Sequence, residues 1–347
     1  MPHCRIVLLA AFLLIAPAIA QAAASLWPAS PIPGYLQISN PMGSSFYRQD
    51  AVISDGSGGG FVGWPEFGTI RVQHKLASGL IASGWVPVGS TACPSTPGGN
   101  RDYVSLAPDA GQGVYAAWVD SRPGDFADIY LQHLLGDGTV APGWPSDGVR
   151  VTNVASTYDF YPVLGSDGAG GVYVCWVAYD LGTGTPSHRV TRLTSAGAFA
   201  SGWSFAGVAL HTTGTTGWPA VLASDGANGV LAAFVADSQL RVQRLLANGT
   251  QDTAHWPADG AIVSNNVVAS TLFGPVMVAR APAETYLAWC DRRFGQSDAY
   301  VLRLTPDGIS AGWPATGVAA ASTVADENDL AATLDGTRSV NVTYQGP

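Results

Sequence analysis

The sequence predicts an all-β fold built from six copies of one unit, and two spacings carry this prediction. A bulky aromatic residue closes the second apolar segment of each copy, with gaps of 54, 58, 58, 55 and 55 residues. A tryptophan marks a later turn, with gaps of 58, 59, 59, 53 and 57 residues. Two markers that keep one period indicate a repeat architecture. The markers are Trp64, Trp118, Trp176, Phe234, Trp289 and Tyr344 in the first series, and Trp27, Trp85, Trp144, Trp203, Trp256 and Trp313 in the second.

The third copy shows the elements of the unit most clearly. It contains the segments YPVLGS (161–166), GVYVCWVA (171–178), HRVTRL (188–193) and GVALH (207–211). Short segments of alternating apolar residues, bounded by Gly, Asp and Pro turns, predict a four-stranded antiparallel sheet. Radial repetition of such a sheet is a β-propeller. We therefore predict a six-bladed β-propeller of four-stranded antiparallel blades.

The two ends of the chain predict how the ring closes. Residues 26–39 match the late part of a copy, whereas residues 328–344 match only the early part. A strand within residues 35–39 is therefore expected to join the last blade and clasp the ring. That blade would be incomplete, with three strands. The alternative is that the sequence is a fragment of a longer chain.

The first residues are expected to be removed from the mature protein. Arg5 precedes an apolar run over residues 6–20, and small residues follow that run. This pattern predicts a secretory signal peptide over residues 1–24 and a single β-propeller domain over residues 25–347. A membrane anchor is the alternative, although no later segment reaches about 18 consecutive apolar residues. We expect a secreted monomer, extracellular, at the cell surface or periplasmic, with no membrane span.

Composition excludes several partners. The chain has 16 Lys+Arg against 25 Asp+Glu, a net charge of −9, and one lysine, Lys75. An acidic chain without a stripe of basic residues binds nucleic acid or an anionic membrane poorly. Cys93, Cys175 and Cys290 have no metal-ligand spacing, so we expect free, buried thiols. No metal and no cofactor are expected.

Turn residues recur between the first two segments of the copies. Asp55, Asp167 and Asp225 each stand in an SDG turn, where Asp-Gly suits a tight hairpin. Calcium binding is the alternative, but no D-x-D-x-D ladder surrounds these residues. His74 and His133 share one repeat position, for which we expect a solvated strand site and no metal.

Copies two (118–151) and five (289–318) resemble the W-x-D-x-R-x-G-x-x-D-I-Y-x-Q-R-L repeat units of secreted bacterial β-propeller proteins. The resemblance implies a secreted or surface-associated propeller without an assigned reaction. The segment Thr305-Pro306-Asp307-Gly308 resembles, more weakly, the Asp-box turn of sialidase-type propellers. The arginine triad and the Tyr/Glu pair that such enzymes require are not recognisable in this sequence.

Copies two and five also share a charged set in the loop between their second and third segments. An arginine between two carboxylates would hold this loop with charge-assisted hydrogen bonds. Reuse in two copies favours a structural clamp over catalysis, and we predict no catalytic residue. The clamp residues are Asp120, Arg122 and Asp128 in copy two, and Asp291, Arg293 and Asp298 in copy five.

The segments that lead into the first strands carry the candidate binding residues. In a propeller these segments surround one mouth of the central channel. Aromatic rings beside Arg and Asp suit sugars, whose faces stack and whose hydroxyl groups form hydrogen bonds. We expect Arg48 and Arg101 to contact an acidic or hydroxylated ligand. The candidate set is Tyr47, Arg48, Arg101, Asp102, Tyr158, Asp159 and Trp218.

These observations favour a secreted, non-enzymatic propeller that acts as a binding or adhesion module for a glycan or an extracellular protein. One alternative is a glycosidase or lyase that uses Asp102, Asp159 or Asp329. A glycosidase needs two carboxyl groups roughly 5–9.5 Å apart, which sequence does not establish. Another alternative is a purely structural repeat unit of a larger surface protein.

Overall fold

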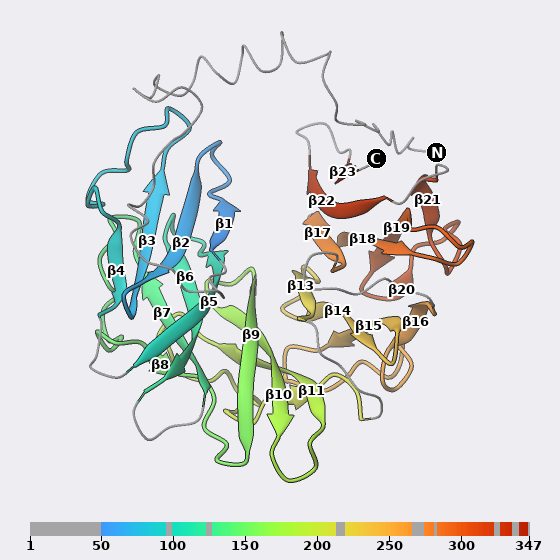
Figure 1. The fold of residues 1–347 in the computed structure, drawn as a ribbon, viewed down its shortest axis with the longest axis horizontal. Helices are drawn as coiled ribbons and strands as arrows, with labels where there is room; N and C mark the ends of the chain where they lie inside the picture. The colour runs from blue at the N-terminus through green and yellow to red at the C-terminus, as the bar shows by residue number, and fades with distance from the viewer. Residues whose placement is uncertain are drawn as a thin grey trace.

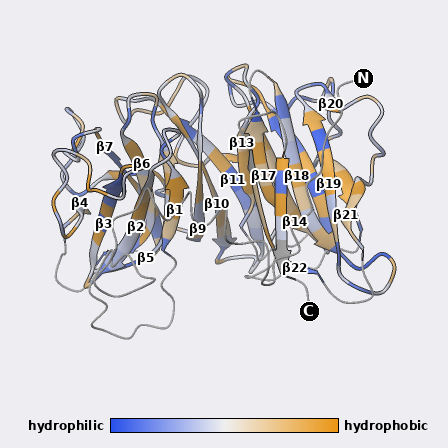
Figure 2. Cartoon of the chain, turned by 90° about the horizontal axis from the view of Figure 1, so that it is seen from above, coloured by the Kyte–Doolittle hydropathy of each residue, from blue (hydrophilic) through white to orange (hydrophobic). Residues whose placement is uncertain are grey.

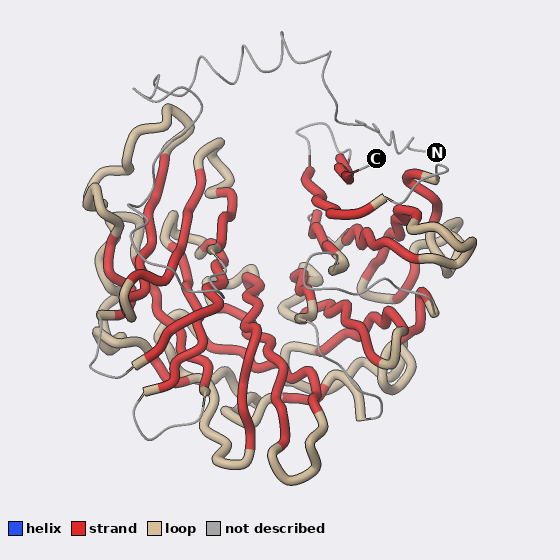
Figure 3. The backbone as a smooth tube through the Cα atoms, viewed as in Figure 1, coloured by secondary structure: helices blue, strands red, loops and turns tan. Residues whose placement is uncertain are grey.

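A computed structural model shows an all-β chain composed of strands and loops (Figure 3). It describes residues 50–94, 99–122, 127–212, 219–265, 274–280, 283–322, 327–334 and 340–345. The expected signal peptide and the expected closing strand at residues 35–39 lie outside these ranges. Across the described ranges there is no helix with the length and apolar character needed to cross a membrane.

Six antiparallel sheets follow one another along the chain. Sheet 1 contains β1 (Ala51–Ser54), β2 (Gly60–Glu66), β3 (Thr69–Lys75) and β4 (Ser90–Cys93). Sheet 2 contains β5 (Asn100–Pro108), β6 (Val114–Ser121), β7 (Asp128–Leu134) and β8 (Val149–Arg150). Sheet 3 contains β9 (Thr157–Ser166), β10 (Val172–Asp180), β11 (Pro186–Leu193) and β12 (Val208–Ala209).

The remaining sheets repeat this plan. Sheet 4 contains β13 (Val221–Ser224), β14 (Val230–Ala236), β15 (Gln239–Leu245) and β16 (Ala261–Ser264). Sheet 5 contains β17 (Val276–Arg280), β18 (Glu284–Asp291), β19 (Asp298–Thr305) and β21 (Val318–Ala321), with the short β20 (Gly308–Ile309) also pairing β19. Sheet 6 has two described strands, β22 (Asn328–Leu334) and β23 (Val340–Gln345).

The sheets form a β-propeller arrangement. The first strands of successive sheets lie together: β1 by β5, β5 by β9, β9 by β13, β13 by β17 and β17 by β22. Figure 1 shows the sheets in an arc from sheet 1 (blue) to sheet 6 (red), with these strands on the inner side. The all-β class and the four-stranded antiparallel sheets are confirmed. The described part of sheet 6 does not include a third strand.

Each sheet has two ends with different loops. One end carries the loops between second and third strands and the connections into the first strands, and we call it the loop face. The other end carries the turns that join first to second and third to fourth strands, and we call it the turn face. β5 and β9 therefore begin at the loop face, whereas Lys75, which ends β3, lies at the turn face.

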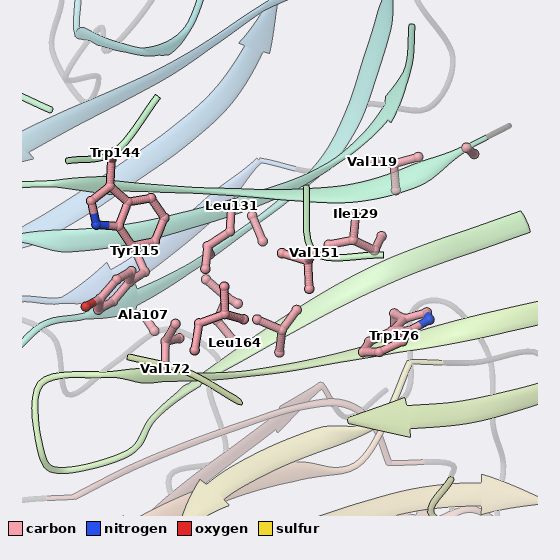
Figure 4. Packing of buried hydrophobic residues seen from close by; sticks show 14 of the residues in the cluster. Ala107, Tyr115, Val119, Ile129, Leu131, Trp144, Val151, Leu164, Val172 and Trp176 are labelled. Atoms are coloured by element: carbon pink, nitrogen blue, oxygen red, sulfur yellow. The ribbon is translucent and has the colours of Figure 1, made fainter. Parts of the chain in front are cut away.

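Apolar side chains from neighbouring sheets meet in a series of cores. Between sheets 2 and 3, Tyr115, Leu131 and Trp144 face Leu164 and Val172 (Figure 4). Hydrophobic colouring concentrates on the strands in Figure 2, as expected for sheets that are covered on both sides.

The tryptophans of the second strands belong to these cores. Trp118, Trp176 and Trp289 are 0, 2 and 0% exposed, which agrees with a packing role. Gly148 explains how closely the chain approaches Trp118. A Cβ atom at Gly148 would lie 2.5 Å from that ring, and the backbone there has a φ of +83°.

Four tryptophans of the second marker series link neighbouring sheets, from sheet 1 to sheet 5, through their indole N–H groups. Each indole donates to a carbonyl oxygen in the β-turn after the third strand of the following sheet. We call this series the indole relay. Its members are Trp85 to Gly136 (2.9 Å), Trp144 to Ser195 (2.9 Å), Trp203 to Ala247 (2.8 Å) and Trp256 to Pro306 (2.8 Å).

Aspartates organise the turns between first and second strands, which supports the turn interpretation. Asp167 Oδ1 accepts the backbone N–H groups of Ala169 and Gly171, both at 2.7 Å. Its Oδ2 accepts Arg192 Nη2 of the third strand at 2.7 Å. Both carboxylate oxygens are therefore used by the protein. The same arrangement joins Asp55 to His74, Asp109 to His133 and Asp225 to Arg244.

The two histidines in these turns differ from the expectation of a solvated position. His74 and His133 are 5 and 6% exposed, and their Nε2 atoms lie 3.0 and 2.7 Å from the turn carboxylates. Each ring also stacks on an aromatic residue of its own sheet, Phe61 or Tyr115. The alternating strand pattern did not reveal this, because the turn aspartate brings a polar partner into the buried side of the sheet.

The three described cysteines are free and buried, as expected. Burial raises the pKa of the Cys93 thiol to about 11. A thiol with such a raised pKa is a weak nucleophile at neutral pH.

Candidate functional site

Four of the seven candidate binding residues fall within the described ranges. Arg101 and Asp102 lie at the start of β5, and Tyr158 and Asp159 lie at the start of β9. Contacts between β5 and β9 bring these two strand starts together on the loop face. Tyr47, Arg48 and Trp218 lie outside the described residues, as does the side chain of Asp329.

Arg101 is enclosed by protein groups. Its side chain is fully buried, and its Nε donates to Asp120 Oδ2 at 2.9 Å. Its Nη1 also donates to the carbonyl oxygen of Gly68 in sheet 1. A ligand could reach this guanidinium only by displacing these partners. The geometry therefore gives Arg101 a role in joining sheets 1 and 2.

Asp120 is the centre of the clamp in sheet 2. Its Oδ2 accepts Trp118 Nε1 at 3.0 Å, Arg101 Nε at 2.9 Å and Arg122 Nε at 3.1 Å. The guanidinium of Arg122 lies over the ring of Tyr130, 4.0 Å from its centroid. One buried carboxylate thus accepts hydrogen bonds from two guanidinium groups and fixes the indole of the core tryptophan.

The second carboxylate of the sheet 2 clamp is not the one expected from sequence. Arg122 Nη1 donates to Asp147 Oδ2 at 2.6 Å, whereas Asp128 accepts Arg150 Nε at 3.0 Å and the Thr152 hydroxyl at 3.1 Å. The reason is the strand register. β7 pairs with β8 so that Tyr130 lies opposite Arg150, which places that guanidinium beside Asp128.

Sheet 5 repeats the first half of the clamp. Asp291 Oδ2 accepts Trp289 Nε1 at 2.9 Å, and Asp291 Oδ1 accepts Arg293 Nε at 2.8 Å. Arg293 lies 3.7 Å from the centroid of the Tyr300 ring. Asp298 is buried, and its Oδ2 lies 3.5 Å from the Tyr300 hydroxyl.

In sheet 3 a different residue accepts the indole N–H. Ala178 stands where sheet 2 has Asp120, and Asp159 on β9 stands opposite Ala178, as Arg101 stands opposite Asp120. Asp159 Oδ1 accepts Trp176 Nε1 at 3.1 Å. Asp159 is only 1% exposed. Burial, together with the charge of Asp128, raises the pKa of Asp159 to about 6, although hydrogen bonds to neighbouring groups act in the opposite direction.

This raised pKa predicts a pH-dependent stability. The unfolded chain ionises Asp159 near pH 4, whereas the folded protein keeps the proton until about pH 6. Protonated Asp159 contributes fully to the free energy of unfolding below about pH 4. This contribution is lost as pH rises through about 6, so the free energy of unfolding falls by roughly 2–3 kcal/mol. We expect Asp159→Asn, which stays neutral, to exceed the wild type by about 2 kcal/mol at pH 7.5 and to match it near pH 4. Urea unfolding at several pH values measures this, and parallel stability profiles would contradict it.

Four half-buried aromatic residues form a continuous group at these strand starts, which we call the aromatic array. Ring centroids lie 5.9 Å apart for Tyr158 and Phe160, 6.2 Å for Phe160 and Tyr161, and 4.9 Å for Tyr161 and Tyr103. Tyr103 comes from β5, and the others come from β9. The array therefore crosses from sheet 2 to sheet 3.

The backbone is strained at two members of the array. Tyr103 and Tyr161 have φ values of 55° and 53°, in the left-handed region that bulky residues rarely adopt. Each lies at a β-bulge, where the pairing of β5 with β6 and of β9 with β10 shifts register. A bulge re-aims a side chain, and strain of this kind clusters at functional sites.

Sequence reasoning found part of this array. The sequence predicts Tyr158 as a candidate binding residue, because it leads into a first strand. It places Tyr161 in the strand itself and predicts no binding role for it. The polar and apolar pattern gives side-chain alternation and does not reveal a bulge. The equivalence of Tyr103 and Tyr161 in two aligned copies is the signal that could have identified the pair.

Comparisons with known proteins identify the fold and no activity. No protein-family model matches the chain, and no curated protein matches it significantly. A protein of unknown function from Dyadobacter fermentans is similar in structure, with a TM-score of 0.52 and 11% identity over 85% of this chain and 94% of that chain. The likeness is one of fold.

Two further solved structures are similar at lower scores. An endo-arabinase from Bacteroides thetaiotaomicron has a TM-score of 0.41 and 11% identity, over 89% of this chain and 92% of that chain. An α-L-arabinanase from Penicillium chrysogenum, complexed with arabinobiose, has a TM-score of 0.44 and 12% identity, over 76% and 78%. At such scores the comparisons carry no argument about activity.

Proposed function

We propose that this protein is a secreted, non-enzymatic β-propeller that binds a glycan on its loop face, through the aromatic array. The observation that supports this most strongly is the pair of strained tyrosines, Tyr103 and Tyr161, held edge to face by bulges in two adjacent inner strands. Half-buried rings offer apolar faces to the C–H surfaces of sugar rings, and phenol groups add hydrogen bonds. Secretion follows from the expected signal peptide at residues 1–24.

The charges near the array favour a neutral glycan over an acidic one. Arg101 is neutralised by Asp120, so it offers no free positive charge to a ligand carboxylate. Asp102 lies at the start of β5, and its Oδ2 accepts Asn100 Nδ2 at 2.6 Å. A carboxylate can accept hydrogen bonds from sugar hydroxyl groups but would repel a uronate.

The alternative function is a glycosidase or lyase, and Asp159 supports it. A carboxyl group with a raised pKa is the usual general acid of such enzymes. Against this reading, Asp159 is buried and its Oδ1 is bonded to the core residue Trp176. The binding proposal therefore accounts for more of the geometry. A purely structural repeat unit, or an array that docks a protein, are the remaining alternatives.

The test is a glycan-array screen of residues 25–347, followed by titration of each hit. We expect Tyr103→Ala and Tyr161→Ala each to weaken binding about fivefold or more, because each ring stack contributes about 1 kcal/mol or more. Phe205→Ala is the matched control, since Phe205 is 47% exposed and precedes β12, the outer strand of sheet 3, whereas the array lies on the inner strands. Undiminished binding in both tyrosine variants would show that the aromatic array is not the binding site. Turnover of a bound glycan would favour the alternative function, a glycosidase or lyase.

We also propose that the ring has six blades and is closed by the N-terminal segment, with residues 35–39 taking the place of the fourth strand in a three-stranded sheet 6. The repeat phase of residues 26–39 supports this, since it continues the unit that β22 and β23 begin. A closed ring removes exposed sheet edges, which otherwise promote association, and this fits a monomer.

A further inference from the structure

A small pocket lies on the loop face between sheets 4 and 5, away from the aromatic array. Its volume is about 170 Å³, and it is lined by Ile262, Val263, Ser264, Asn265, Arg293 and Thr316. The first four come from the end of β16 and the residue after it, Arg293 follows β18, and Thr316 precedes β21. The lining is mainly apolar with a few polar groups, as ligand sites usually are.

The repeat in sheet 2 shows what normally fills this position. The clamps of the two sheets agree in their tryptophan, aspartate, arginine and tyrosine. They differ three residues after the turn tryptophan, where sheet 2 has Asp147 and sheet 5 has Thr316. In sheet 2, Arg122 donates to both a side-chain and a backbone oxygen of Asp147. Its Nη1 donates to the Asp147 carboxylate at 2.6 Å, and its Nη2 donates to the Asp147 carbonyl oxygen at 2.7 Å.

In sheet 5 only the carbonyl acceptor is present. Arg293 Nη1 donates to the Thr316 carbonyl oxygen at 2.9 Å, and Nη2 donates to Asp291. Each of these nitrogens carries two hydrogens, so a hydrogen-bond donor remains on each. The acceptor oxygen that Asp147 supplies in sheet 2 has no counterpart among the lining residues of this pocket.

Charge decides which kind of acceptor suits the pocket. Partial burial lowers the pKa of Arg293, but the hydrogen bond and charge of Asp291, with a smaller contribution from Asp298, raise it overall. In sheet 2 the additional cation Arg150 accompanies Asp128, but Ala319 stands at that place in sheet 5. The sheet 5 site is therefore already negative without a further carboxylate. A neutral acceptor fits it better than an anion.

We propose that this pocket binds a neutral sugar residue, whose hydroxyl oxygens accept hydrogen bonds from Arg293. The ring C–H groups would pack on Ile262 and Val263. Asn265 can donate to, or accept from, a further hydroxyl group. The site is independent of the aromatic array and does not require that the array bind a glycan.

The two sister repeats supply a reciprocal pair of variants. Thr316→Asp places the missing carboxylate beside Arg293 and should fill the acceptor position. Asp147→Thr makes the reverse exchange beside Arg122, remote from the pocket, and is the matched control. Both changes exchange a residue for the one that the sister repeat already holds, so each is compatible with a folded sheet. Thermal unfolding of both variants checks this.

Binding is measured by NMR titration with a panel of neutral monosaccharides, with D-glucuronate as the charged counterpart. We expect saturable binding of a neutral sugar to the wild type at millimolar concentration, at least about tenfold weaker binding to Thr316→Asp, and little effect of Tyr161→Ala. Asp147→Thr should bind the sugar as the wild type does, because the pocket in sheet 5 is unaltered. Equal binding to folded Thr316→Asp, preference for glucuronate, or the absence of any binding from the panel would overturn the proposal.

Discussion

Replacing Asp120 by alanine is expected to lower the free energy of unfolding by about 3–5 kcal/mol, because it leaves a buried charge without its partner. Arg101 and Asp120 have fully buried side chains, 2.9 Å apart at Nε and Oδ2. The same substitution removes the acceptor of the Trp118 indole and one acceptor of Arg122.

Urea unfolding followed by tryptophan fluorescence measures this loss. Asp291→Ala is the matched control, because Arg293 is partly exposed and can be hydrated once its carboxylate is removed. We expect that control to lose clearly less stability, about 1–2 kcal/mol. Comparable losses of stability in the two variants would show that the burial of Arg101 does not increase the cost of removing its carboxylate. That result would contradict the assignment of Asp120 as the centre of the clamp.

If the N-terminal segment closes the ring as proposed, Trp27 becomes a buried residue, and Trp27→Ala is expected to lower the free energy of unfolding by about 3–5 kcal/mol. The indole relay gives the reason. Its four bonds span 51, 51, 44 and 50 residues, and Trp27 precedes Ala77 by 50. Ala77 lies in the turn of sheet 1 that corresponds to the acceptor turns of sheets 2 to 5. If the N-terminal segment closes the ring, the Trp27 indole is expected to donate to the Ala77 carbonyl.

The turn of sheet 1 is already formed to accept this bond. Leu76 N–H donates to Leu80 at 2.9 Å and Gly79 N–H to Leu76 at 2.8 Å, like the equivalent bonds around Gly138. Leu80 is 59% exposed, an apolar surface that a docked segment could cover. Trp144→Ala is the positive control, since its relay bond is observed. A neutral Trp27→Ala beside a damaging Trp144→Ala would show that the segment does not dock there.

The sequence predicted those parts of the fold that repeat. Aromatic spacing and apolar alternation are properties of each strand's own sequence. They therefore predicted the four-stranded sheets and the burial of Trp118 and Trp289. The partner of Asp128 was not predictable in the same way. Arg150 is 22 residues distant and reaches Asp128 only through the pairing of β7 with β8.

The candidate site was harder to predict because copies exchange roles between strands. Asp159 was selected as a surface ligand residue, yet it replaces Asp120 as the acceptor of a core indole from a different strand. Arg101 was selected for its charge, which Asp120 neutralises. Such an exchange leaves no local pattern, since sheets 2 and 5 satisfy the buried indole N–H group with a carboxylate of the second strand, whereas sheet 3 uses one of the first strand.

The position of Lys75 has a practical consequence for measuring sugar binding on a sensor surface. It is the one lysine of the chain, and partial burial lowers the pKa of its ammonium group. Apart from the α-amino group, amine-reactive chemistry on a sensor surface therefore has one side chain to attack. That side chain ends β3 at the turn face, opposite the array and the pocket. Coupling through Lys75 would immobilise the molecules in a uniform orientation, with both proposed sugar sites directed towards the solution.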